Sequence, residues 1–191
     1  MPPTLYTLGY EKRSILEFTD LLLQAGIGVL VDVRESAWSH KPGFSKKALD
    51  AALRTVGIEY VHASFAGNPR ALRQTAPDHA ACLDAYRSYV HQNASILERL
   101  EELVASYQAM GARVCLTCYE RHADDCHRGI LAECWGTRGA RRVEHLAVEG
   151  CLRLVPAQMR AGILERRTRA SPRPTYTTPP GTPSSLHPQG D

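Results

Sequence analysis

Two cysteines, a glutamate and a histidine–arginine pair lie close together in one short stretch of the sequence. Cys118 and Glu120 follow an apolar run, and Cys126, His127 and Arg128 stand at the expected start of the next helix. A helix N-terminus presents unpaired N–H groups and the positive end of the helix dipole. A cysteine placed there should have a lowered pKa, and an arginine beside it can hold a phosphate or carboxylate. The stretch therefore predicts a nucleophile, an anion site or both; in the competing interpretation Cys126 packs under the helix and Arg128 forms an ion pair.

The same residues allow two other kinds of site. Cys118, Cys126 and His127 can supply three zinc ligands, but no fourth ligand is evident in the sequence, so neither a metal nor another cofactor is predicted. A reversible disulfide between Cys118 and Cys126 is also conceivable. Cys115 and Cys118 look like a metal or redox pair, yet residues three apart on a strand point to opposite faces of the sheet. We therefore expect Cys115 to be a core residue.

The elements that must position these residues alternate between strand and helix. Apolar runs predict strands over residues 5–8, 29–33, 58–62, 114–117 and 143–146. Ser14 and Glu17 have the spacing of a capping box, and Ser45 is expected to cap the second helix. Residues 80–108 predict two helices broken near 93–95, and residues 128–135 a short helix, whereas 63–78 shows no period and predicts a long loop. The alternation favours a single three-layer, Rossmann-like α/β domain over residues 1–155, with a mostly parallel sheet of about five strands.

Polar residues follow nearly every predicted strand. In open parallel sheets ligands bind beyond the carboxyl ends of the strands, so these residues should share one rim. Arg34 and Arg128 are expected to hold an anion there, with Tyr10 and Asp32 as further substrate contacts. Glu120 or His62 would move protons. The alternatives stay open, because Asp32 and Arg34 can form an ion pair that locks the loop, and a histidine at a strand end is often structural.

Length and composition restrict the class of protein. The chain has 191 residues and a net charge of +3, which suits one domain and argues only weakly for nucleic-acid binding. No export signal or membrane-spanning run is evident, so the six cysteines are expected to be reduced in the cytoplasm. From Arg166 the chain turns basic and then rich in Pro, Thr and Ser, which predicts a disordered tail over residues 166–191.

The order of several motifs resembles one known family. The chain resembles the domain of unknown function 488 family over roughly residues 4–148, because three motifs occur in the order typical of that family. They are Thr7-Leu8-Gly9-Tyr10, Leu30-Val31-Asp32-Val33-Arg34, and Cys118-x-Glu120 followed by Cys126-His127-Arg128. The resemblance implies a small three-layer α/β domain without an established reaction. That family usually has proline at the position of Ala37 and arginine at that of His40, so an anion bound there would be held more weakly. It also has a proline and a Gly-Gly pair where this chain has residues 63–67.

Three functional hypotheses follow. The leading one is an enzyme, or a domain derived from one, that binds a phosphate-bearing small molecule such as a nucleotide and uses Cys126 or Cys118 as nucleophile. The second is rhodanese-like sulfur transfer through Cys118, since Asp32-Val33-Arg34-Glu35 resembles rhodanese domains, although the acidic residues after Cys118 would repel anionic sulfur donors. The third is a non-enzymatic ligand sensor or partner-binding module.

Overall fold

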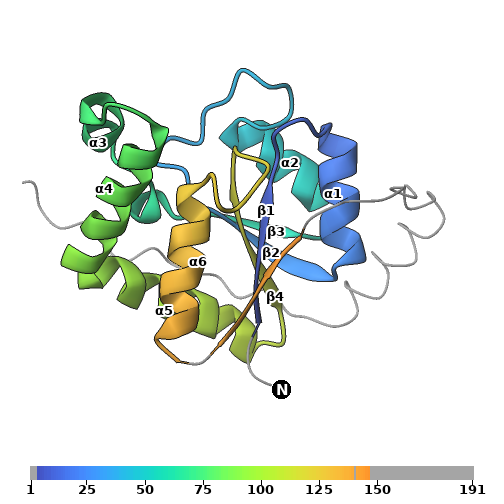
Figure 1. The fold of residues 1–191 in the computed structure, drawn as a ribbon. Coiled ribbons are helices and arrows are strands. Elements are labelled where there is room, and N and C mark those ends of the chain that lie inside the picture. The colour runs from blue at the N-terminus through green and yellow to red at the C-terminus, as the bar shows by residue number, and fades with distance from the viewer. Residues whose placement is uncertain (1–3, 140, 147–191) are drawn as a thin grey trace, which may run out of the picture.

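A five-stranded sheet forms the middle layer of the protein (Figure 1). The computed structural model describes residues 4–139 and 141–146. The strands are β1 (Thr4–Gly9), β2 (Ile27–Asp32), β3 (Glu59–His62), β4 (Arg113–Cys118) and β5 (Arg142–His145). They lie in the order β3-β2-β4-β1-β5, and all neighbouring pairs are parallel. The predicted α/β class and the parallel sheet of about five strands are confirmed.

Helices cover both faces of this sheet. The helices α1 (Ile15–Gln24) and α2 (Lys46–Thr55) lie on one face, and α4 (His79–Gln92), α5 (Ala94–Ala109) and α6 (His127–Thr137) lie on the other (Figure 1). The loops that leave β1 and β2 thus lead to one face, whereas the loop that leaves β4 leads to the opposite face. Such a divergence opens a crevice above the carboxyl ends of the strands, where ligands of open α/β sheets bind.

Local signals in the sequence explain where the first helices begin and end. The Ser14 hydroxyl accepts the Glu17 N–H at 3.2 Å, and the Glu17 carboxylate accepts the Ser14 N–H at 2.6 Å, so the predicted capping box is present. Gly26, with φ of 68°, follows α1 in a conformation that suits glycine. Ser45 stands before α2 as predicted, but its hydroxyl makes no capping bond and instead donates to the Ser39 carbonyl at 2.9 Å.

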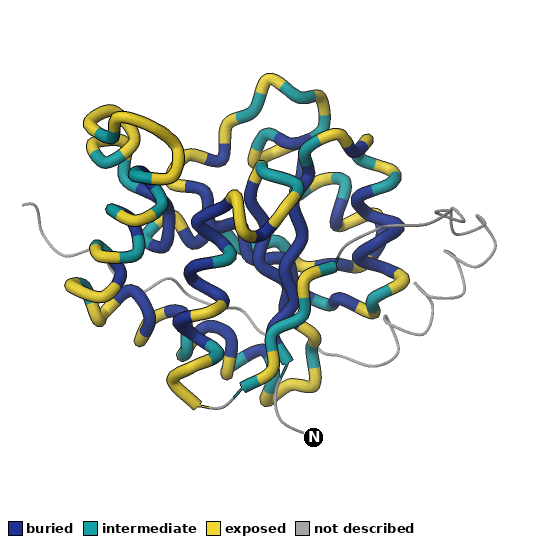
Figure 2. The backbone as a smooth tube through the Cα atoms, viewed as in Figure 1, coloured by how far each residue is buried: buried dark blue, intermediate teal, exposed yellow. Residues whose placement is uncertain are grey.

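Two hydrophobic cores flank the sheet, and Figure 2 shows the buried chain concentrated between the layers. Phe18, Leu22 and Leu53 of α1 and α2 belong to one core, together with Cys115. Cys118 belongs to the other core, beneath α4, α5 and α6. The two cysteines of β4 therefore face opposite sides of the sheet, as their spacing on a strand predicted.

The prediction of a long loop over residues 63–78 was wrong. This segment contains a 3₁₀ helix, η1 (Ser64–Ala66), and a short helix, α3 (Arg70–Thr75). Elements of three and six residues span less than two helical turns, so they leave no period for sequence analysis to detect. The predicted tail over residues 166–191 lies outside the described residues, as does the end of the predicted domain. None of the helices described is long and apolar enough to cross a bilayer.

Candidate functional site

A cleft of about 900 Å³ opens above the carboxyl ends of the central strands. Its walls come from the loop after β1, the loop after β2, the region of α3 and α4, and the end of β4 with the first residue of α6. Five of the predicted site residues line it: Tyr10, Arg34, Cys118, Glu120 and His127. The crevice that the sheet topology implies is thus also where the chemically capable side chains meet.

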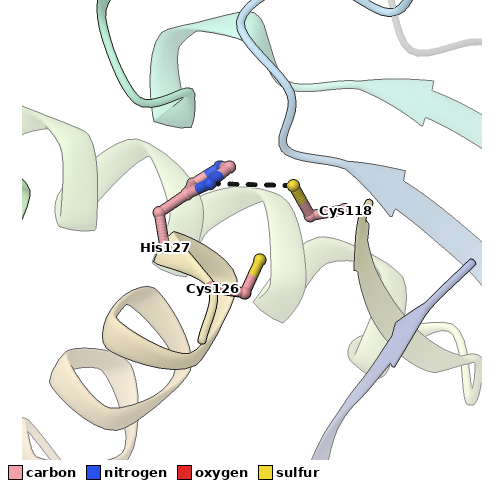
Figure 3. Close-up of side chains that lie close together, drawn as sticks. All are labelled: Cys118, Cys126 and His127. Atoms are coloured by element: carbon pink, nitrogen blue, oxygen red, sulfur yellow. Dashed lines mark hydrogen bonds between the residues drawn. The ribbon is translucent and has the colours of Figure 1, made fainter. Parts of the chain in front are cut away.

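Two thiols and one imidazole ring form a compact cluster (Figure 3), and two of these three residues, Cys118 and His127, line the cleft. Cys118 is the last residue of β4, Cys126 is the N-cap of α6, and His127 is the first residue of that helix. The two Sγ atoms and one ring nitrogen of His127 all lie within 4.8 Å of one another, and the Cys118 Sγ to His127 Nδ1 distance is 3.6 Å. We call these three residues the thiol–imidazole centre.

The His127 ring is held in one orientation by the backbone. Its Nε2 atom lies 2.9 Å from the Val33 carbonyl oxygen, just beyond β2. A carbonyl only accepts hydrogen bonds, so Nε2 carries a proton and Nδ1 is the atom that faces the thiols. The Tyr86 ring packs edge-on against the imidazole, with centroids 5.2 Å apart. Because the Val33 carbonyl and Tyr86 of α4 both contact the ring, they orient Nδ1 toward the thiols.

Burial changes the expected chemistry of Cys126. The residue is only 1% exposed, and this burial, with the neighbouring Cys118, raises the pKa of the Cys126 thiol. The prediction of a lowered pKa at the helix N-terminus was therefore wrong, since loss of hydration outweighs the helix dipole and His127. Cys118 is also buried, but it lines the cleft, whereas Cys126 does not. Of the two thiols, Cys118 is the one that a ligand in the cleft can approach.

Glu120 lies beside the same centre. Burial would raise the pKa of its carboxyl group, but interactions with Cys126, with its own backbone and with His127 outweigh burial and lower that pKa. Its Oε2 atom is buried and has no hydrogen-bond partner among the described residues. The Glu120 carboxylate is therefore ionised beside the two thiols, and its role in moving protons stays a prediction.

Arg34 forms the centre of a buried polar network at the cleft wall. Its guanidinium binds both carboxylate oxygens of Asp32, at 2.8 and 2.5 Å, and donates to the Tyr10 hydroxyl at 2.7 Å and the Phe44 carbonyl at 3.0 Å. Tyr60 donates to the same carboxylate at 2.7 Å. The interpretation of Asp32 and Arg34 as an ion pair that locks the loop fits this geometry, because most of the arginine donors are already in use.

Four of the predicted site residues do not line the cleft: Asp32, Cys126, Arg128 and His62. Arg128 is 2% exposed, and its guanidinium donates to the carbonyls of Glu120 and Arg121 at 2.5 and 3.0 Å, so it shapes the loop after β4 and does not present a fork to a ligand. His62 lies on the edge strand β3, where its Nε2 atom is 2.9 Å from the Arg34 carbonyl. The structure thus does not bring Arg128 or His62 to the cleft that holds the thiol–imidazole centre.

The cleft also contains residues that sequence reasoning missed. Lys41 lies in the wall, with Nζ 2.9 Å from the Tyr10 carbonyl, and Trp38 is 62% exposed there. Asn68 is buried, and its Oδ1 atom has no hydrogen-bond partner in the described part of the chain. The departures from the family pattern at Ala37 and His40 mark the loop that carries Lys41 and Trp38, and were the one available signal.

Comparisons with known proteins identify a family but not an activity. The model of the family described as "Domain of unknown function DUF488" matches residues 14–135. No curated protein matches the chain. Among solved structures, a DUF442 protein from Shewanella putrefaciens CN-32 is 12% identical, covers 85% of each chain and gives a TM-score of 0.35. At this identity and TM-score, the likeness does not bear on function.

Proposed function

The chain belongs to the domain of unknown function 488 family, and we propose that it is an enzyme acting on a phosphate-bearing small molecule held in the cleft above β1, β2 and β4. One observation carries the proposal: Cys118 and His127 of the thiol–imidazole centre, at the start of α6, line the same cleft as the Lys41 ammonium. Helix N-termini and ammonium groups both bind phosphate oxygens.

The donors available to a phosphate come from the helix and the lysine. The N-cap residue of α6, Cys126, makes no side-chain capping bond, so its thiol satisfies none of the first N–H groups of that helix. The Lys41 ammonium uses one of its three donors on the Tyr10 carbonyl. Arg34 contributes less to anion binding than its charge suggests, because Asp32 neutralises it.

The remainder of the cleft suits a substrate with a flat, partly apolar group. Trp38 exposes most of its ring in the wall, where it packs edge-on against His40 with centroids 4.0 Å apart. An exposed tryptophan in a concave site offers a stacking surface for an aromatic ring. A nucleotide combines such a ring with a phosphate, so nucleotides are the first substrates to test.

A binding assay tests the substrate class. Nucleoside 5′-monophosphates and sugar phosphates should bind in isothermal titration calorimetry, and the matching nucleosides and sugars should not. Lys41→Met should weaken phosphate binding about 10-fold or more, as loss of a hydrogen bond to a charged group typically does. Lys47→Met is the matched control, because Lys47 is exposed on α2 and does not line the cleft. If neither phosphate series binds, or if both variants bind as the wild type does, the phosphate proposal fails.

A turnover assay separates an enzyme from a sensor. The ligands that bind are incubated with the protein and followed by phosphorus NMR, with Cys118→Ser and His127→Gln as inactive variants. Turnover that both variants lose supports the proposal, whereas tight binding without turnover would favour a non-enzymatic ligand sensor. Thiosulfate- and cyanide-dependent turnover that Cys118→Ser abolishes would favour sulfur transfer instead.

A further inference from the structure

We propose that Cys118, Cys126 and His127 bind a Zn²⁺ ion at the cleft, with two thiolates and the imidazole Nδ1 atom as ligands. The inference rests on the proposed function, since it names what occupies the reacting centre of that enzyme. In this arrangement Cys118 is a metal ligand and not itself the nucleophile.

The spacing of the three atoms suits tetrahedral zinc. With a Zn–S bond of about 2.3 Å and a Zn–N bond of about 2.0–2.1 Å, two ligands of a tetrahedron lie about 3.6 Å apart. The Cys118 Sγ to His127 Nδ1 distance is 3.6 Å, and all three ligand atoms fall within 4.8 Å of one another. The three side chains converge from β4 and the start of α6 (Figure 3), so an ion can bind between them with only small movements of the thiols.

The surroundings of His127 are those of a metal-bound histidine. Such residues donate their second ring N–H to a carboxylate or backbone carbonyl, which fixes the ring and directs the other nitrogen at the metal. Here Nε2 lies 2.9 Å from the Val33 carbonyl, and Nδ1 faces the two thiols. This contact joins the loop after β2 to α6 and orients the ligand in advance.

Charge and ligand type favour zinc over other common ions. Two thiolates balance the charge of Zn²⁺, so the occupied centre would carry no net charge, which suits residues that are 1–8% exposed. Thiolate and imidazole ligands select zinc over magnesium and calcium, which prefer oxygen. Three protein ligands and one open position are typical of catalytic zinc sites, and Cys118, His127 and Glu120 all line the cleft. The open position would therefore face the substrate.

Metal analysis of the full chain tests the proposal. The protein is expressed with added zinc and purified under a phosphine reductant, so that no Cys118–Cys126 disulfide forms. We expect about one zinc per chain, the stoichiometry of a single tetrahedral site. After removal of zinc, Co²⁺ should give the visible bands of a tetrahedral complex and a thiolate charge-transfer band of the intensity expected for two thiolates.

Cysteine variants show whether the right thiols bind. Cys118→Ser and Cys126→Ser should each halve the charge-transfer band. Each should also weaken Zn²⁺ binding by more than roughly 10–100-fold, which is the effect of losing a residue that only hydrogen-bonds to a metal ligand. Cys134→Ser is the matched control, because Cys134 is also buried on α6 but lies outside the centre. Far-UV circular dichroism checks that the variants fold. If they do not, the cobalt spectrum of the wild type still counts the thiolates.

The outcomes separate this inference from the proposed function. A zinc-free wild type whose cobalt spectrum lacks a thiolate band overturns the zinc site, as does equal loss of metal in Cys134→Ser. If phosphate binding still depends on Lys41 in that case, the proposed function stands without the metal. If the chain holds zinc on these thiols but binds no phosphate, the metal site stands and the proposed substrate class fails.

Discussion

Replacing Arg34 tests whether this residue is part of the framework or a substrate ligand. Its guanidinium and the Asp32 carboxylate have side-chain exposures of 7% and 0%, and they form a two-point ion pair. Arg34→Met keeps much of the side-chain volume but leaves the Asp32 charge buried with fewer partners. We therefore expect a large loss of stability from a change at the cleft wall.

The size of this loss follows from the contacts that remain. Removing one partner of a buried ion pair costs about 3–5 kcal/mol. The Asp32 carboxylate keeps its hydrogen bonds from the Tyr60 hydroxyl, at 2.7 Å, and from the Arg34 backbone N–H, at 3.1 Å. These bonds place the expected loss at the lower end, about 3 kcal/mol, which corresponds to a fall in Tm of about 6–12 °C for a protein of this size.

Thermal and urea unfolding followed by circular dichroism measure this loss. Arg54→Met is the matched control, since Arg54 forms an exposed ion pair with Asp50 on α2, and we expect no measurable change there. An Arg34→Met variant with the Tm and urea midpoint of the wild type would refute the structural role of the pair. If that variant also lost phosphate binding, Arg34 would be the anion ligand that its sequence position suggested.

Three further predictions concern the elements around the cleft. Gly9→Ala should destabilise the protein by about 1–3 kcal/mol, because a Cβ atom there would lie 1.8 Å from the Glu120 carbonyl oxygen. Thermal unfolding measures this loss, and a variant as stable as the wild type would contradict the close approach. Ser14→Ala should lower the free energy of unfolding by about 1 kcal/mol, since it removes the capping bond to the Glu17 N–H, and an unchanged urea midpoint would count against that cap. In metal-free, reduced protein, Cys126 should react with iodoacetamide more slowly than a free thiol up to a pH of about 8.5, because burial raises its pKa. Peptide mass spectrometry measures the labelling, and rapid labelling near neutral pH would contradict this prediction.

Much of the framework could be predicted because its signals are local. The Ser14–Glu17 capping box needs only the right residues three positions apart, and both of its hydrogen bonds are present. The opposite orientations of Cys115 and Cys118 follow from the alternation of side chains along a strand. The shared rim follows from parallel strands, whose carboxyl ends meet at one edge of the sheet. Each inference depends on backbone geometry that the sequence determines over a few residues.

The roles of the arginines could not be predicted, because they depend on contacts made after folding. Arg34 and Arg128 have the residue type and the position of anion ligands, yet their donors are used by Asp32, by Tyr10 and by backbone carbonyls. The sequence contains no sign that the loop after β4 would place the Glu120 carbonyl beside Arg128. Lys41 was missed because it lies in a loop without a period and enters the cleft only through tertiary structure.

The burial of the thiols bears on how the centre can react. A cysteine nucleophile must ionise and reach its substrate, but Cys126 is 1% exposed and burial raises its pKa. Activation of that thiol by the helix dipole would have to overcome this loss of hydration, and Glu120 adds a negative charge nearby. A divalent cation removes the difficulty, because it stabilises both thiolates directly and turns the nearby carboxylate into a favourable neighbour. The same burial that argues against a free nucleophile at Cys126 also fits the packing of this residue under α6, and the proposed metal site would be a second reason for it.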